Sequence, residues 1–190
     1  LLKNVLDQYD ADLIGLQEAT PDWIECIERD YGEDYEIFYQ YRGKNSLECT
    51  PLLFRKSRFE CLDHGHFWLS ETPDVMSKDW GAACYRICSY VILTENASGK
   101  DFVVFNTHLD HVSEKARVLG AQAVCGIMGE RKDKWNFPMV LMGDMNDYPT
   151  SGPIRTFLED KKLALADHTD GMGTTWHGYG TAHHERIDYI

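Results

Sequence analysis

The stretch Met139-Val-Leu-Met-Gly-Asp-Met-Asn-Asp-Tyr-Pro149 decides how this 190-residue sequence is interpreted. Its first four residues form an apolar run as long as a buried strand, and Gly143 lets the backbone turn where that strand ends. Asp144, Asn146 and Asp147 are therefore expected on a loop at the carboxyl end of a strand, where open α/β sheets bind ligands. A carboxylate and a carboxamide two residues apart suit work on a phosphate. The alternative is an ordinary Asx turn, because Asp and Asn are common turn formers.

Length and composition indicate one globular domain over residues 1–190, large enough to bury a sizeable core. The net charge is −12, and the sequence has no Lys/Arg cluster of the kind that grips a long nucleic-acid backbone. We therefore expect a small substrate, or a polymer that is held by a few positive groups and a divalent metal.

Six cysteines are scattered along the chain without a Cys-x-x-Cys pair, so we expect reduced thiols that are buried as small hydrophobic side chains. This cysteine usage is consistent with a cytoplasmic protein. The sequence shows no signal peptide and no apolar run of membrane-spanning length, so no membrane partner is expected. The chain starts inside a predicted helix and stops inside a predicted strand, and we expect both ends to be trimmed.

Hydrophobic periodicity and turn residues predict a mixed chain in which strands outnumber helices. We expect an α/β or α+β fold with mostly antiparallel pairing. Residues 70–81 lack periodicity and are expected to form a long loop, a feature that is often functional. Helices are predicted over 1–9, 21–30, 113–131 and 153–160, and strands over 13–16, 35–39, 52–54, 59–68, 86–94, 102–106, 139–142, 174–176 and 186–190.

A second apolar strand ends in polar groups at Asn106-Thr-His-Leu-Asp-His111. His108 is suited to donate a hydrogen bond to a phosphate oxygen or a leaving group. The alternative is a histidine that is simply satisfied at a strand end. A zinc cluster of His108, Asp110 and His111 ranks low, because this spacing belongs to none of the usual zinc patterns.

Glu18 and Asp188 are two further acids at or inside predicted strands. Glu18 follows a short apolar strand, where a carboxylate is costly without a partner such as a metal ion. Its alternative role is an N-terminal charge for the helix that begins near Pro21. Asp188 has apolar neighbours and is expected to be partly buried, and its alternative role is an edge-strand charge that discourages aggregation.

Four of these stretches, in this order, resemble the endonuclease/exonuclease/phosphatase superfamily with its DNase I-like fold. They are Ile14-Gly-Leu-Gln-Glu18, Asn106-Thr-His-Leu109, Gly143-Asp-Met-Asn146 and Arg186-Ile-Asp-Tyr189. The stretches Phe67-Trp-Leu-Ser-Glu-Thr-Pro73, Trp80 and Gly173-Thr-Thr-Trp-His-Gly178 resemble the branch near the carbon-catabolite-repressor-type deadenylases and their bacterial relatives. The resemblance implies a four-layer sandwich of two packed mixed β-sheets flanked by helices.

The resemblance also implies a role for each residue of the site. Glu18 is the implied carboxylate ligand of Mg²⁺, with Mn²⁺ as an alternative ion. Asp144 orients and deprotonates the attacking water, Asn146 hydrogen-bonds the phosphate, and His108 stabilises the charge of the transition state. Asp188 is expected to orient a catalytic histidine that the family places further along its chain.

Two substrate contacts are expected in addition to these residues. Arg86 follows the long loop and is a candidate phosphate contact. Trp176, with Trp68, Trp80 and Tyr85, offers a stacking surface for a single-stranded RNA 3′ end, although core or loop packing is the favoured role for most of these rings.

The expected activity is Mg²⁺-dependent hydrolysis of a phosphodiester or phosphomonoester by in-line attack of water, on a phosphorylated small molecule. A 3′ exonuclease of the deadenylase type, acting on single-stranded nucleic acid, is the rival enzyme. The family's first strand, with its metal-site Asn, and its late Asp-His pair have no counterpart within residues 1–190. A catalytically inactive binding module is therefore a third hypothesis.

Overall fold

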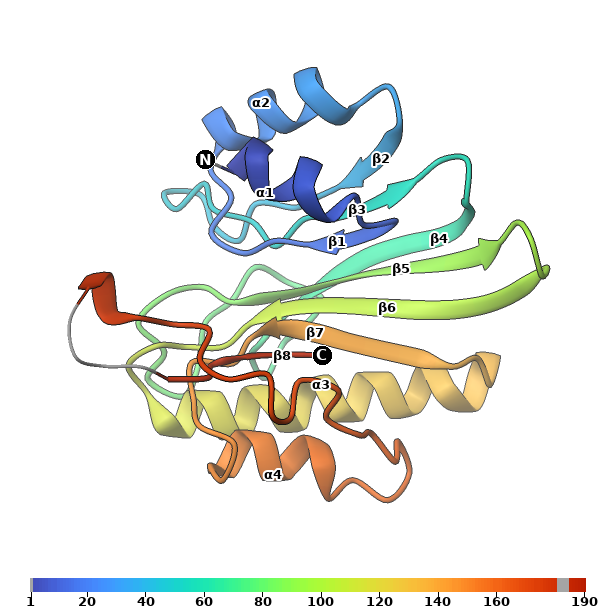
Figure 1. Cartoon of the computed structure of the whole chain (residues 1–190). Coiled ribbons are helices and arrows are strands. Elements are labelled where there is room, and N and C mark those ends of the chain that lie inside the picture. Colours follow the sequence, from blue (N-terminus) through green and yellow to red (C-terminus); the bar gives the residue numbers. More distant parts are fainter. Residues whose placement is uncertain (1, 181–184) are drawn as a thin grey trace.

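The helices and strands stack in four layers, which follow one another from top to bottom in Figure 1. The computed structural model describes residues 2–180 and 185–190. Two helices, α1 (Leu2–Tyr9) and α2 (Pro21–Tyr31), cover a sheet made of β1 (Leu13–Gly15), β2 (Tyr35–Phe38) and β3 (Leu52–Arg55). The second sheet contains β4 (Phe59–Trp68), β5 (Ile87–Glu95), β6 (Lys100–His108), β7 (Met139–Asp144) and β8 (Asp188–Tyr189). Its outer face is covered by α3 (Glu114–Trp135) and α4 (Gly152–Leu158), and a short 3₁₀ turn, η1, spans Gly178–Gly180.

Strand pairing confirms the expected α/β sandwich. The small sheet has the order β1-β3-β2 and is antiparallel throughout. The large sheet has the order β4-β5-β6-β7-β8, in which β6 and β7 run parallel and the other pairs antiparallel. A parallel pair needs a crossover connection, and α3 supplies it. The crossover makes β6 and β7 end at the same edge of the sheet, on the left in Figure 1.

Alternating side chains in β3 fill two different layers of the sandwich. Leu52 and Phe54 point between the two sheets, where they pack with Val91 and Val104 of the large sheet. Leu53, between them, points outward and packs under α2. This follows from the two-residue period of a strand, which sends successive side chains to opposite faces.

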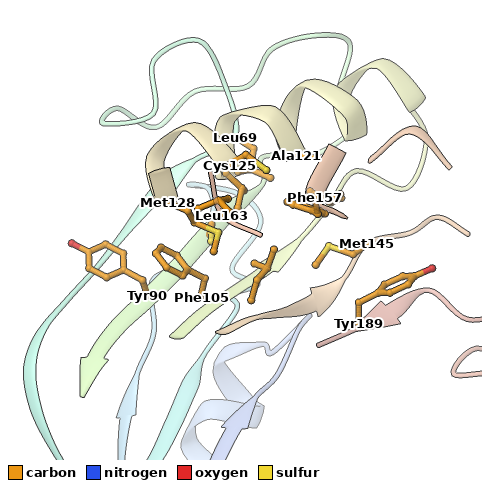
Figure 2. Packing of buried hydrophobic residues seen from close by; sticks show 14 of the residues in the cluster. Leu69, Tyr90, Phe105, Ala121, Cys125, Met128, Met145, Phe157, Leu163 and Tyr189 are labelled. Carbon is orange, nitrogen blue, oxygen red and sulfur yellow. The ribbon is translucent and has the colours of Figure 1, made fainter. Parts of the chain in front are cut away.

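The main core lies between the large sheet and α3 with α4 (Figure 2). Phe105 and Tyr90 come from neighbouring strands, and Cys125 and Met128 come from one face of α3. Ser113 caps α3 by accepting a hydrogen bond from the backbone of residue 116. The helix therefore starts at the expected residue, and its apolar face lies over the sheet.

Asn106 joins the two sheets from the middle of the sandwich. Its side chain is fully buried, and its Nδ2 donates to the backbone oxygens of Leu16 (2.8 Å) and Pro51 (2.9 Å). Its Oδ1 accepts a hydrogen bond of 2.7 Å from Gln17 Nε2. A second buried link joins Thr50 Oγ1 to Ser89 Oγ at 3.0 Å. These bonds fix the end of β1 against β6, although the two segments are about 90 residues apart in sequence.

Gly15 is required for this close approach of the sheets. A Cβ atom at this position would overlap the sulfur of Met142 on β7 and would lie 3.1 Å from Asn106 Cγ. The absence of a side chain therefore lets the end of β1 reach the large sheet.

Several predicted boundaries differ from the observed ones. The strands at 102–106 and 139–142 are longer than expected, so His108 and Asp144 are the last strand residues and do not lie on loops. The predicted strand at 174–176 is wrong, because only an isolated bridge between Trp176 and Glu185 forms there. The expectation of buried cysteines is wrong for Cys26, which is exposed on α2. In residues 2–180 and 185–190, no helix combines the length and apolar character that crossing a bilayer requires.

We predict that Asn106→Ala lowers the free energy of unfolding by about 3 kcal/mol, because two buried carbonyls and Gln17 lose their partner. Urea denaturation measures this loss. The matched control is Asn96→Ala, which removes an exposed amide that bonds Ser57 O and should cost under about 0.5 kcal/mol. Similar losses for the two variants would show that Asn106 does not hold the sheets together.

Candidate active site

Three predicted site residues lie side by side at the edge where β6 and β7 end. Parallel pairing places His108 opposite Asp144, and antiparallel pairing places Asp144 opposite Asp188. We call His108, Asp144 and Asp188 the strand-end row. Gly143 has a φ of 153° and no room for a Cβ atom against the Thr107 backbone, so only glycine lets β7 lie this close to β6.

Asp144 is a half-buried carboxyl group among other acids. Burial raises the pKa of Asp144 to about 7. The backbone N–H of Asn146 and the positive charge of Arg86 oppose this rise, whereas the negative charges of Asp188 and Glu18 add to it. Asp144 is therefore poised to hold or release a proton near neutral pH. Burial also raises the pKa of Asp188.

His108 is a buried, neutral imidazole. Burial lowers its pKa to about 2, and the nearby charges of Arg86 and Arg42 act in the same direction. Its Nε2 lies 3.5 Å from Asp144 Oδ2, which is too long for a good hydrogen bond. Because the imidazole is neutral, this contact is no ion pair. A neutral ring still carries one N–H that can donate to a ligand.

Glu18 reaches this edge from the other sheet. It is exposed and has a φ of 56°, a left-handed conformation that costs a non-glycine residue free energy. Both neighbours are fixed, since Gln17 bonds Asn106 and Ala19 forms a backbone bridge with Cys49. The helix that follows carries Asp22 in its first turn, so its terminus has an acid without Glu18.

Asn146 and Asp144 form the Asx turn that was the alternative explanation for this loop. Asp144 Oδ1 accepts a 2.8 Å hydrogen bond from the Asn146 backbone N–H, and Asn146 has a φ of 49°. The Asn146 side chain lies toward β6, where its Nδ2 donates to Leu109 O at 3.0 Å. The turn and the site are therefore one structure, because the turn positions both side chains.

Two other acids of these loops have structural partners. Asp147 is buried and forms an ion pair with Arg117 of α3, with 2.7 Å between Oδ2 and Nε. Asp110 accepts four hydrogen bonds, from the backbone N–H groups of residues 83, 84, 112 and 113. Burial alone would raise the pKa of Asp110, but these bonds hold it below its usual range. Asp110 thereby fastens the end of the long loop to the start of α3, and this use argues against the zinc cluster.

Arg86 lies directly before β5, close enough to influence the pKa values of both His108 and Asp144. The side chains of Arg86 and Arg42 are both buried. Arg42 was not among the residues predicted from the sequence. Arg86 Nη2 contacts His111 Nδ1 at 3.1 Å. Arg42 bonds Ser46 and pairs with Glu48. Two guanidinium groups therefore stand beside the strand-end row.

The aromatic candidates are divided between packing and the surface. Trp68 is buried and donates from Nε1 to Arg42 O at 3.0 Å, so it has a packing role. Trp80 bonds Glu71 within the long loop. Trp176 is half-buried, and its backbone pairs with Glu185. Among the described residues, no side-chain hydrogen bond joins Trp176 to the strand-end row.

A cavity of about 510 Å³ lies elsewhere, between β7, α4 and the segment 163–168. Apolar side chains such as Leu141, Phe157 and Leu165 line much of it. It contains neither His108 nor any acid of the strand-end row. The polar sheet edge, and not this cavity, is therefore the candidate active site.

Comparisons with known proteins identify the family of the chain. The model of the Endonuclease/Exonuclease/phosphatase family matches residues 1–190. The chain belongs to this family.

Two solved structures resemble the chain with a TM-score of 0.89 each. One is a mannosyl-6-phosphatase of Bacteroides thetaiotaomicron, 30% identical, with 99% of this chain and 73% of that chain covered. The other is an endonuclease/exonuclease/phosphatase protein of Bacteroides vulgatus, 28% identical, with 99% and 75% covered. Protein angel of Drosophila melanogaster is 27% identical over 159 residues, which are 81% of this chain and 44% of that protein. The chain thus spans less than half of Protein angel. These likenesses confirm the DNase I-like fold of the family.

We predict that Asp144→Asn stabilises the metal-free protein at pH 8 but not at pH 4. The folded-state pKa of Asp144 lies above its usual value, so the folded state binds more protons and loses stability as pH rises from about 4 to 7. Asparagine avoids this loss, which amounts to roughly 2–4 kcal/mol. Urea denaturation with a chelator at both pH values measures the difference. Asp74→Asn, on the exposed loop, is the control and should be neutral. A pH-independent difference for Asp144→Asn would contradict the prediction.

Proposed function

We propose that this family member is a Mg²⁺-dependent phosphoesterase, which hydrolyses a phosphomonoester or phosphodiester by in-line attack of water. The observation that carries this proposal is the register that aligns His108, Asp144 and Asp188 across three strands. Glu18 adds a fourth group from the segment that follows β1. Its position is fixed because Gln17 bonds Asn106 and Ala19 pairs with Cys49.

The donor chemistry at this edge fits Mg²⁺. Glu18 is an exposed carboxylate, and its charge and that of Asp188 are both near enough to raise the pKa of Asp144. In the described part of the chain, no three His, Cys, Asp or Glu side chains form a metal-binding group. Mg²⁺ does not require such a group, because it can be held by one or two carboxylates and keeps several waters. Glu18 is the proposed ligand, and Mn²⁺ is an alternative ion. When bound, the ion would neutralise charge that develops on the phosphate oxygens.

Asp144 is the proposed general base. A base works best when its pKa lies near the operating pH, and burial brings Asp144 to about 7. The Asx turn holds one of its oxygens, Oδ1, on the Asn146 N–H. Asp144 would take a proton from the attacking water through its carboxylate.

His108 and Asn146 are the proposed donors to the phosphate. The neutral His108 ring can donate one N–H to the phosphate without adding a charge. Because the ring is buried, bulk water does not compete with the phosphate for this N–H. Asn146 is held by Leu109 O through one of the two N–H bonds of its amide. Preorganised donors of this kind favour a transition state in which charge spreads over the phosphate oxygens.

The family and its members support a phosphorylated substrate. The Bacteroides thetaiotaomicron relative, 30% identical, is named a mannosyl-6-phosphatase. The net charge of −12 favours a phosphorylated small molecule over a long nucleic acid. A single-stranded RNA 3′ end is the alternative, for which Trp176 would supply a stacking surface.

The test compares p-nitrophenyl phosphate, bis-p-nitrophenyl phosphate and oligo(A) in Mg²⁺, Mn²⁺ or a chelator. Turnover of a nitrophenyl ester that the chelator abolishes supports the proposal. Preference for oligo(A) would favour the exonuclease. Absence of turnover with every substrate and ion would favour the binding module.

We predict that Asp144→Ala lowers turnover by about three orders of magnitude or more, because the proposed base is lost. Asp147→Ala is the matched control from the same loop. It breaks the ion pair with Arg117 and should lower the melting temperature while lowering turnover much less. Steady-state kinetics and thermal melting separate the two effects. Mild, equal effects on turnover would count against the assigned roles.

A further inference from the structure

Arg86 is a buried cation whose hydrogen-bonding groups are largely unused. The residue is 4% exposed, and neither Nε nor Nη1 has a hydrogen-bond partner among the described residues. These two nitrogens carry three of the five N–H bonds of a guanidinium group. Its remaining contact is with the exposed His111, at 3.1 Å. Because Arg only donates, His111 Nδ1 must be the acceptor in this contact.

Among the described residues, no carboxylate forms a salt bridge with Arg86, although the charges of Asp110 and Asp144 lie near enough to favour its charged form. Glu48 pairs with Arg42, and both oxygens of Asp110 accept backbone N–H groups. Asp144 bonds Asn146 and belongs to the proposed catalytic set. The positive charge of Arg42 also lies near Arg86 and His108, since it helps to lower the pKa of both residues. This corner of the site therefore holds a buried guanidinium group with unmet N–H donors and no salt-bridge partner among the described residues.

A buried arginine with these features makes a poor structural element. Buried polar groups are nearly always satisfied in native proteins, and the exceptions require an explanation such as a missing ligand. Arg131 of α3 provides a contrast. Its Nε is also buried without a partner, but its guanidinium stacks on the Tyr90 ring at 3.8 Å, away from the strand-end row. Arg86 has no such stacking contact among the described residues.

We propose that Arg86, assisted by Arg42, binds the terminal oxygens of a phosphomonoester dianion and makes this chain a phosphomonoesterase. The inference rests on the proposed function, because it places the phosphate between the guanidinium groups and the strand-end row. A monoester presents three non-bridging oxygens and up to two negative charges. These match the unmet N–H bonds and the positive charge of Arg86, and guanidinium groups recognise phosphate well.

A phosphodiester fits this corner less well. It carries a single negative charge, and a second ester group replaces one terminal oxygen. That group would either displace the phosphate from Arg86 or face it with carbon atoms, leaving buried N–H bonds without acceptors. Arg86 therefore selects against diesters as well as for monoesters.

The first experiment measures hydrolysis with Mg²⁺ in the wild type, Arg86→Gln, Arg86→Lys and the control Arg131→Lys. For Arg86→Gln, kcat/KM should fall about 100-fold on p-nitrophenyl phosphate and less than about fivefold on bis-p-nitrophenyl phosphate. Arg86→Lys keeps the charge and should lie between Arg86→Gln and the wild type, whereas Arg131→Lys should match the wild type. Equal losses on both esters, or a wild type that prefers the diester, would overturn the inference while leaving the proposed function in place.

The second experiment needs no turnover and no metal. Inorganic phosphate should raise the melting temperature of the wild type more than dimethyl phosphate does, and Arg86→Gln should lose this difference. Without phosphate, Arg86→Gln should melt at or above the wild-type temperature, because it removes an uncompensated buried charge. A lower melting temperature together with unchanged phosphate binding would make Arg86 structural and overturn the inference. If the wild type hydrolyses neither ester, the proposed function fails, and the phosphate response alone decides the role of Arg86.

Discussion

The site depends on one constraint, the hydrogen bonds by which the Asn106 side chain joins the two sheets. Glu18 lies in the segment that follows β1 of the small sheet, and the strand-end row belongs to the large sheet, so the two meet only if the sheets keep one relative position. Hydrophobic packing between the sheets is non-directional and does not fix that position by itself. The buried carboxamide does, because its three hydrogen bonds reach the backbone of residues 16 and 51 and the side chain of Gln17. Gly15 removes the side chain that would keep the sheets apart.

The second constraint is the parallel pairing of β6 and β7. Every other neighbouring pair in the large sheet is antiparallel, so this pair alone ends its two strands at one edge. The pairing brings an imidazole and a carboxyl group to 3.5 Å in a place shielded from water. Burial disfavours the charged form of each group, so it lowers the pKa of His108 and raises that of Asp144. The placement of these two groups thus follows from sheet topology.

Much of this arrangement could be predicted from the sequence, because apolar runs that end in polar groups identify strand ends. His108, Asp144 and Asp188 were found in this way, and pairing confirms that they adjoin. Local patterns could not predict Arg42, since its role arises from the distant segments that bury it. Nor could they show that Asp110 would be used by four backbone N–H groups from two loops. The roles assigned to the site residues remain predictions, because geometry alone does not test them.

The site concentrates several features that each cost folding free energy. Glu18 and Asn146 have left-handed backbones, Asp144 is a half-buried acid among like charges, and Arg86 is a buried cation with unmet donors. Asp144 faces the negative charges of Asp188 and Glu18, and Arg86 faces the positive charge of Arg42, so the two unfavourable charges are of opposite sign. A divalent cation at the acids and a phosphate at the arginines would each relieve one of them, and each would strengthen the binding of the other. To compensate both costs through binding, a ligand must bring positive charge to the acids and negative charge to the arginines. A phosphate accompanied by its metal ion is such a ligand.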